Sequence, residues 1–210
     1  MSSNRFVAAL KRIPFTVAMV LIVAAIGIAT ATHVARLEPG LMKRFGFAPL
    51  HLPRGEWVRL FTSAFLTAGG WSFYRSLAML ALCLGLSEYR VGSWRTMLAF
   101  WGVHLATLAF VSLLLAFPLY HLDVVWRKLL AAEHDVGPSA GYYGCLGFVC
   151  QKWPEKRRHW LYALIGGVLL ARLVWAALSP RPPHALFGAD IAHLVAFPLG
   201  IALGRFVLRN

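Results

Sequence analysis

The sequence has few charged residues and very few acidic ones. Of its 210 residues, 14% are charged, 59% are hydrophobic and only 8 are Asp or Glu. A soluble globular domain is about 25% charged and about 45–50% apolar. A chain of this length cannot enclose all of these apolar side chains in one core, so many of them must face lipid. The composition therefore excludes a soluble domain and a disordered chain, and the length allows roughly six membrane spans.

The sequence also lacks paired cysteines. Its three cysteines, Cys83, Cys145 and Cys150, lie in apolar runs without a CxxC spacing. We therefore expect small buried side chains rather than a disulfide or a zinc site, and neither a metal nor another cofactor. The net charge of +13 comes from short basic clusters between apolar runs. Such clusters are typical of membrane topology signals, so we expect a lipid bilayer and no nucleic acid as partner.

Six apolar segments alternate with short polar ones. They cover about residues 13–35, 72–87, 96–118, 139–151, 160–178 and 189–207. Residues 36–59 are too short to span twice and too apolar for a simple linker, which favours a first loop that lies in the membrane interface. The sequence thus predicts an all-α polytopic membrane protein, with a single domain over residues 1–210 and a core at about 13–207.

The basic clusters predict the orientation in the membrane. The dense cluster from Lys152 to Arg158 falls, by parity, on the same side as the N-terminal Lys11 and Arg12. The positive-inside rule then places both termini in the cytoplasm. A signal peptide is the alternative for the first segment, because Ala29-Thr30-Ala31 fits a cleavage site, but the apolar stretch is long for one and further spans follow. Without a cleavable presequence, a bacterial inner membrane is the simplest location.

A serine and a histidine are the candidates for chemistry. Ser139 stands in a GxSxG pattern, which marks a nucleophile in α/β hydrolases, but here no strand precedes it. Ser139 lies twelve residues before Gln151, and His193 lies twelve residues before Arg205. At 1.5 Å per helical residue, both lie roughly 18 Å from the cytoplasmic boundary. A hydroxyl and an imidazole at one depth suit nucleophilic catalysis. The alternative is a structural role for Ser139, as one of the small residues at a contact between helices.

Further motifs extend the pattern in a fixed order. Glu56-x-x-Arg59 precedes the second span, and Glu88-x-Arg90-x-Gly92 follows it. In the sixth span, two small residues, Ala196 and Gly200, follow His193 and are four residues apart. Over roughly residues 13–207 the chain resembles the rhomboid family of intramembrane serine proteases. The resemblance implies a six-transmembrane-helix rhomboid-like bundle that cleaves transmembrane segments of other membrane proteins. It implies Ser139 as nucleophile and His193 as general base, with supporting roles for Gly137, Tyr143, Ala196 and Gly200.

The chain departs from the family pattern in its second span. The family has His and Asn four residues apart there to help hold the oxyanion, and Ser72 and Ser76 occupy those positions here. They are the oxyanion candidates, although a hydroxyl reaches less far than His or Asn. A catalytically inactive relative that binds membrane-protein segments is therefore the alternative hypothesis. A small transporter is a third, but no inverted repeat supports it.

Charged residues inside the spans need partners, because an isolated charge in a bilayer is costly. We expect Arg75 to pair with an acidic loop residue such as Asp135 or Glu133; the alternative is that it supplies positive charge to an oxyanion from a neighbouring face. For Arg172 the sequence indicates no partner. Asp190 precedes His193 by three residues, and we expect it to cap the start of the sixth helix rather than to orient the imidazole.

Overall fold

A computed structural model describes residues 10–121, 131, 134–178 and 184–208. Within these residues the chain is helical, and its extended pairing is limited to two isolated bridges. The elements are α2 (Pro14–Ala29), α3 (Pro39–Phe45), η1 (Pro49–His51), α4 (Arg59–Thr62), η2 (Ser63–Phe65), α5 (Trp71–Val91), α6 (Ser93–Phe110), η3 (Val111–Ala116), α7 (Phe117–His121), α9 (Ser139–Val149), η4 (Cys150–Lys152), α10 (Glu155–Leu178) and α11 (His184–Val207). This confirms the predicted all-α class.

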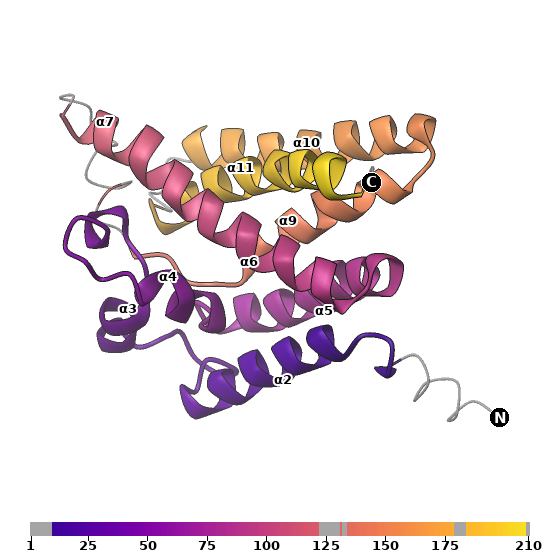
Figure 1. Cartoon of the computed structure of the whole chain (residues 1–210). Coiled ribbons are helices and arrows are strands. Elements are labelled where there is room, and N and C mark those ends of the chain that lie inside the picture. Colours follow the sequence, from indigo (N-terminus) through magenta and orange to yellow (C-terminus); the bar gives the residue numbers. More distant parts are fainter. Residues whose placement is uncertain (1–9, 122–130, 132–133, 179–183, 209–210) are drawn as a thin grey trace.

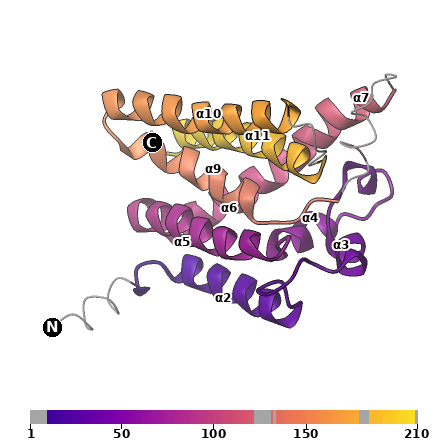
Figure 2. The ribbon, with the colours of Figure 1, turned by 180° about the vertical axis from the view of Figure 1, so that it is seen from behind.

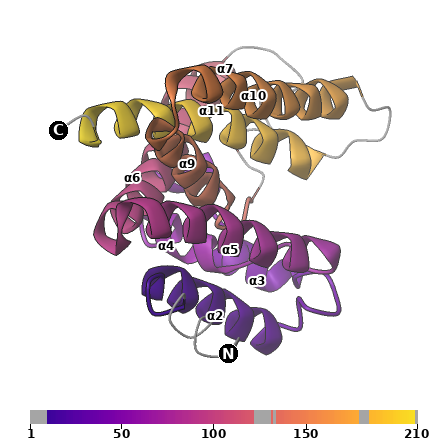
Figure 3. The ribbon, with the colours of Figure 1, turned by 90° about the vertical axis from the view of Figure 1, so that its right-hand side faces the viewer.

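The six predicted spans correspond to helices α2, α5, α6, α9, α10 and α11. The short helix α9 is central and packs against α5, α6 and α11, as the front and side views show (Figures 1 and 3). Helix α2 packs on α5 at one edge of the bundle, and α10 packs on α11 at the opposite edge (Figure 2). The start of α2 and the end of α11 lie at the same end of the bundle (Figure 1). Helix α9 is therefore enclosed by other helices.

Three described helices are long and apolar enough to cross a membrane: Ser93–Tyr120, Glu155–Leu178 and Phe187–Val207. The other three predicted spans are less regular. Helix α2 is apolar but has 16 residues, α9 has 11, and the 21 residues of α5 include Arg75 and two further charges. The short α9 can still lie at membrane depth because it is enclosed by protein.

Several predicted boundaries were wrong. Helix α2 ends at Ala29 rather than near residue 35, because Ala31 turns left-handed with φ of 55° and the Thr30 hydroxyl donates to the Ile26 carbonyl. Helix α11 begins at His184, five residues earlier than expected. The third span continues to His121 through the π-helical segment η3. A π segment widens the helix just before a proline, so the chain can continue past Pro118.

Glu88 joins the first two spans. This residue of α5 is 1% exposed, and its carboxylate accepts hydrogen bonds from the Phe15 N–H at 2.8 Å and from the Thr16 N–H and hydroxyl at 2.7 Å each. These groups belong to the first turn of α2, whose N–H groups have no intrahelical partner. The carboxylate thus caps α2 from a different helix and also meets the positive end of its dipole.

Arg59 holds the first loop together. Its guanidinium forms an ion pair with Glu56 and donates to the carbonyls of Lys43 and, at 3.3 Å, Gly46. The Glu56-x-x-Arg59 motif therefore has a structural role, since it ties α3 to α4. Large apolar side chains of the loop remain exposed, including Trp57, which is 62% exposed. This pattern agrees with a loop that lies at a membrane interface.

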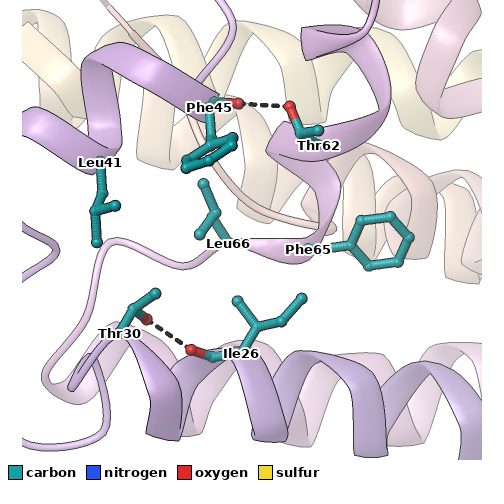
Figure 4. Close-up of a pocket in the computed structure, with 7 residues that line it drawn as sticks. All are labelled: Ile26, Thr30, Leu41, Phe45, Thr62, Phe65 and Leu66. Atoms are coloured by element: carbon teal, nitrogen blue, oxygen red, sulfur yellow. Dashed lines mark hydrogen bonds between the residues drawn. The ribbon is translucent and has the colours of Figure 1, made fainter.

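A cavity of about 260 Å³ lies between α2 and the first loop (Figure 4). It is lined by Ile26, Thr30, Leu41, Phe45, Thr62, Phe65 and Leu66. The hydroxyl of Thr62 donates to the Phe45 carbonyl at 2.8 Å, and that of Thr30 donates to the Ile26 carbonyl at 2.7 Å. Because both hydroxyls are satisfied and no lining side chain titrates, the cavity offers no group for catalysis.

Candidate active site

Helices α9 and α11 make a backbone contact. A Cβ added to Gly200 would lie 2.0 Å from the Gly144 carbonyl oxygen, and one added to Gly147 would lie 2.2 Å from the Phe197 carbonyl oxygen. Ala196, which stands where the family pattern has glycine, is fully buried. Small residues let two helices approach until their side chains interdigitate. This contact fixes the side chains of α9 against those of α11.

His193 lies on this contact, on helix α11. It is 5% exposed, and its ring centroid is 4.7 Å from that of Tyr143 on α9. Ser139 is the first residue of α9 and lies one helical turn before Tyr143, so the two share a face of that helix. The structure thus brings Tyr143 and His193 together and puts Ser139 at the adjoining end of α9. Neither imidazole nitrogen of His193 has a hydrogen-bond partner among the described residues.

Asp190 approaches the imidazole from the same helix. Its Oδ1 lies 3.5 Å from His193 Nδ1 and 2.7 Å from Nη2 of Arg172 on α10, and Asp190 is 4% exposed. The prediction that Asp190 caps the sixth helix was wrong, because α11 begins six residues earlier at His184. Arg172, for which the sequence indicated no partner, is therefore paired across helices. The contact between Asp190 and His193 could have been predicted from their spacing, since residues i and i+3 share a helical face.

The loop before α9 is held by the first loop. The N–H of Gly137 donates to the Ser63 carbonyl at 2.8 Å, and Asp135 and Phe47 exchange backbone hydrogen bonds of 2.8 and 3.0 Å. Gly137 has φ of 139°, which a residue with a side chain rarely adopts. Glycine is therefore required where the chain turns into the helix that begins with Ser139.

The two oxyanion candidates lie on α5, which packs against α9. Ser76 is buried, and Ser72 is half-buried with its hydroxyl 3.5 Å from Nη2 of Arg75. The predicted pairing of Arg75 with Asp135 is absent from the ion pairs of the described residues, and Glu133 lies outside them. Arg75 instead adds a positive charge beside Ser72 at the exposed start of α5.

Other residues singled out in the sequence have structural roles. The three cysteines are buried and free, as expected. Arg90 lies over the Trp153 ring at 4.9 Å, and Gly92 has φ of 85° in the turn between α5 and α6. The capping of α2 by Glu88 was not predicted, because a contact across 72 residues leaves no local pattern. No group of three or more His, Cys, Asp or Glu side chains suited to a metal occurs among residues 10–121, 131, 134–178 and 184–208.

Comparison with known proteins agrees with this architecture. The family model described as Rhomboid domain matches residues 54–210, which include α5 to α11 and every candidate site residue. Neither a curated protein nor a solved structure matches the chain. Since the match covers well over half of the sequence, and three helices are suited to cross a bilayer, the protein is an integral membrane protein that belongs to the rhomboid family.

Proposed function

We propose that this protein is an intramembrane serine protease in which Ser139 is the nucleophile and His193 the general base. The observation that carries the proposal is the buried imidazole of His193, which packs against Tyr143 and whose Nε2 has no hydrogen-bond partner among the described residues. A buried polar group without a partner is costly and points to a role that needs it free. Ser139 lies one turn before Tyr143 on the same helix, and we assign it as the nucleophile.

In this mechanism the Ser139 hydroxyl attacks the carbonyl carbon of a peptide bond while its proton moves to the imidazole of His193. The imidazolium then returns that proton to the leaving amine, and the C–N bond breaks. Water, deprotonated in turn by His193, attacks the ester left on Ser139, and the imidazolium returns the proton to the Ser139 oxygen as the carboxylic acid product leaves. The backbone N–H of Ser139 has no acceptor within its own helix, because it belongs to the first turn. It is therefore available to donate to the oxyanion, and the hydroxyl of Ser76 on α5 is the second candidate donor.

The proposed substrates are transmembrane segments of other membrane proteins. A regular helix hides its peptide carbonyls in its own hydrogen bonds, so a substrate must unwind locally before it can be cleaved. Substrates would enter beside α10, because Leu169 and Ala176 are the only buried residues among its 24 described ones. No metal or cofactor takes part in the proposed reaction.

We further propose that the chain acts as a single domain, with both termini in the cytoplasm of a bacterial cell. Helix α2 lies outside the matched residues 54–210, but Glu88 caps it and thereby ties it to the matched part. The cytoplasmic orientation rests on the basic cluster at Lys152–Arg158. Cysteine-accessibility labelling at positions 3 and 156 in intact cells tests it, and reaction with a membrane-impermeant reagent would contradict it.

The second candidate is an inactive relative that binds membrane segments. The observation in its favour is the pair Ser72 and Ser76, which replaces the His and Asn of the family pattern. Losing one good oxyanion donor costs roughly 10²–10³ in rate in a soluble serine protease. The double substitution Ser72→His/Ser76→Asn should therefore raise the rate of a slow enzyme by about that factor, and it should leave a binding protein inactive.

The primary experiment is labelling of the purified protein in detergent with a fluorophosphonate probe. The wild type should react, and Ser139→Ala and His193→Ala should not. Ser112→Ala is the matched control, because it removes a buried serine whose hydroxyl is engaged with the Leu108 carbonyl at 2.7 Å. It should label like the wild type. A folded wild type that does not react over long incubation at mildly alkaline pH would contradict the protease proposal and favour the binding protein.

A further inference from the structure

We propose that Asp190 is a positioning residue for His193, and that Arg172 holds its carboxylate in place inside the membrane domain. The inference rests on the proposed function and deepens it, because it adds an acid to what the family resemblance presents as a serine–histidine dyad. The contacts form a chain from α10 to α11: Arg172 Nη2 lies 2.7 Å from Asp190 Oδ1, and the same oxygen lies 3.5 Å from His193 Nδ1.

The carboxylate is in an environment where an unpaired charge is not tolerated. Asp190 is 4% exposed, in the second turn of α11, where the backbone N–H groups are already used by the helix. An ionised carboxylate that is removed from water must be paired and hydrogen-bonded to remain charged. The guanidinium of Arg172 supplies both, since its hydrogen bond to a carboxylate is of the short, charge-assisted kind.

The position of the carboxylate selects one tautomer of the imidazole. The contact of 3.5 Å between Asp190 Oδ1 and Nδ1 is not a hydrogen bond in this structure, but a carboxylate on that side of the ring favours a proton on Nδ1 and leaves the Nε2 lone pair free. The ring is also fixed from the side by Tyr143, at 4.7 Å between ring centroids. Asp190 and Tyr143 therefore restrain the ring orientation from two elements, α11 and α9.

The proton balance follows from this arrangement. When the Ser139 oxygen bonds to the substrate carbonyl carbon, its proton moves to Nε2 and the imidazole becomes an imidazolium with both nitrogens protonated. Asp190 stays ionised and stabilises this cation. Nε2 then gives its proton to the leaving amine as the C–N bond breaks, and the neutral imidazole with its proton on Nδ1 is restored. Asp190 neither gains nor loses a proton.

The first test is Asp190→Asn, which keeps the size of the side chain and removes its charge. In soluble serine proteases, the same change behind the histidine lowers kcat about 10⁴-fold, because the imidazole takes the wrong tautomer. We expect the fluorophosphonate labelling rate to fall at least 100-fold. The matched control is Glu155→Gln, which removes the carboxylate that faces Arg158 at 3.8 Å on α10. It should label within twofold of the wild type. Equal labelling of Asp190→Asn and wild type would overturn the inference.

A double variant separates positioning from folding. Asp190→Asn alone leaves the Arg172 cation without its partner, so this variant loses stability as well as labelling. Asp190→Asn/Arg172→Gln removes both charges, and we expect its Tm to return toward that of the wild type. Its labelling should stay low, because the imidazole still lacks the carboxylate. If labelling recovers together with Tm, the ion pair is only structural and the inference is wrong.

A spectroscopic measurement distinguishes failure of this inference from failure of the protease proposal. In ¹⁵N-histidine-labelled protein, a proton shared between Nδ1 of His193 and a carboxylate gives a downfield ¹H resonance. We expect this resonance in the wild type and in Ser139→Ala, and its loss in Asp190→Asn and His193→Ala. If the wild type fails to react with the probe but keeps the resonance, the protease proposal fails while the contact stands. Absence of the resonance from the folded wild type would overturn the inference.

Discussion

Replacing Glu88 by glutamine should destabilise the protein far more than an ordinary loss of one charge. The carboxylate accepts three hydrogen bonds, one from Phe15 and two from Thr16, and the site is buried. A glutamine keeps one oxygen for Thr16, but its amide group faces the Phe15 N–H and cannot accept from it. Two charge-assisted bonds become neutral ones, and one buried donor loses its partner.

The magnitude follows from these three bonds. A net contribution of about 1.5–3 kcal/mol for a bond to a charged group falls to about 0.5–1.5 kcal/mol for a neutral one, so two bonds lose about 2 kcal/mol together. The unpaired N–H of Phe15 adds about 1–3 kcal/mol. The free energy of unfolding should thus fall by about 3–5 kcal/mol. At about 2–4 °C per kcal/mol for a chain of this size, Tm should drop by about 6–20 °C.

The assay is thermal unfolding in detergent, followed by tryptophan fluorescence, together with limited trypsin digestion. Cleavage after Arg12, just before α2, should accelerate in Glu88→Gln because the start of that helix is released. Glu155→Gln is the control, since its carboxylate is exposed and an exposed pair contributes about 0–1 kcal/mol. Thr16→Val combined with Glu88→Gln should be less than additive. A Tm for Glu88→Gln within 2 °C of the control would refute the reasoning.

Two further predictions concern the helix contact and the first loop. Gly200→Ala should lower the free energy of unfolding by about 2–3 kcal/mol, and with it Tm, because the added Cβ meets the Gly144 carbonyl. Gly167→Ala is the control: a Cβ there has no atom within 4 Å, so the change should be neutral or slightly stabilising. Burial lowers the pKa of His51, and the positive charge of Arg59 lowers it further. The neutral ring accepts the Ala48 N–H at its Nδ1. The stability contributed by neutral His51 is present above pH about 6.5 and is lost as the pH falls through its lowered pKa. Tm of the wild type should therefore decline on acidification more steeply than Tm of His51→Asn, and parallel pH curves would contradict this.

Local patterns in the sequence predicted the elements, and contacts distant in sequence decided the rest. Apolar runs located the six helices, because a chain in lipid must satisfy its backbone within each helix. Small residues at Gly144 and Gly200 indicated the contact between the fourth and sixth spans, since close approach needs them. The end of α2 at Ala29 was not predicted, because the residues that follow it, up to 35, carry no Asp, Glu, Lys or Arg and the turn depends on the backbone of Ala31.

The candidate site was only partly accessible from the sequence. Residue counting predicts one depth for Ser139 and His193, because helix rise is constant, and this stays a prediction. The role of Asp190 was misjudged because it depended on where α11 begins, and element boundaries are the least certain part of a sequence reading. The partner of Arg172 lies on another helix, and nothing in the residues between them indicates the pairing.

The ion pair between Arg172 and Asp190 attaches α10, a helix at the edge of the bundle, to the helix that carries His193. In a bilayer, lipid competes with protein for the apolar surface of a helix, so apolar contact alone holds two helices together weakly. A charge-assisted hydrogen bond has no such competitor in lipid. The pair therefore gives α10 a fixed point of attachment beside the candidate site, and loss of either charge would leave that attachment to the weaker apolar contacts.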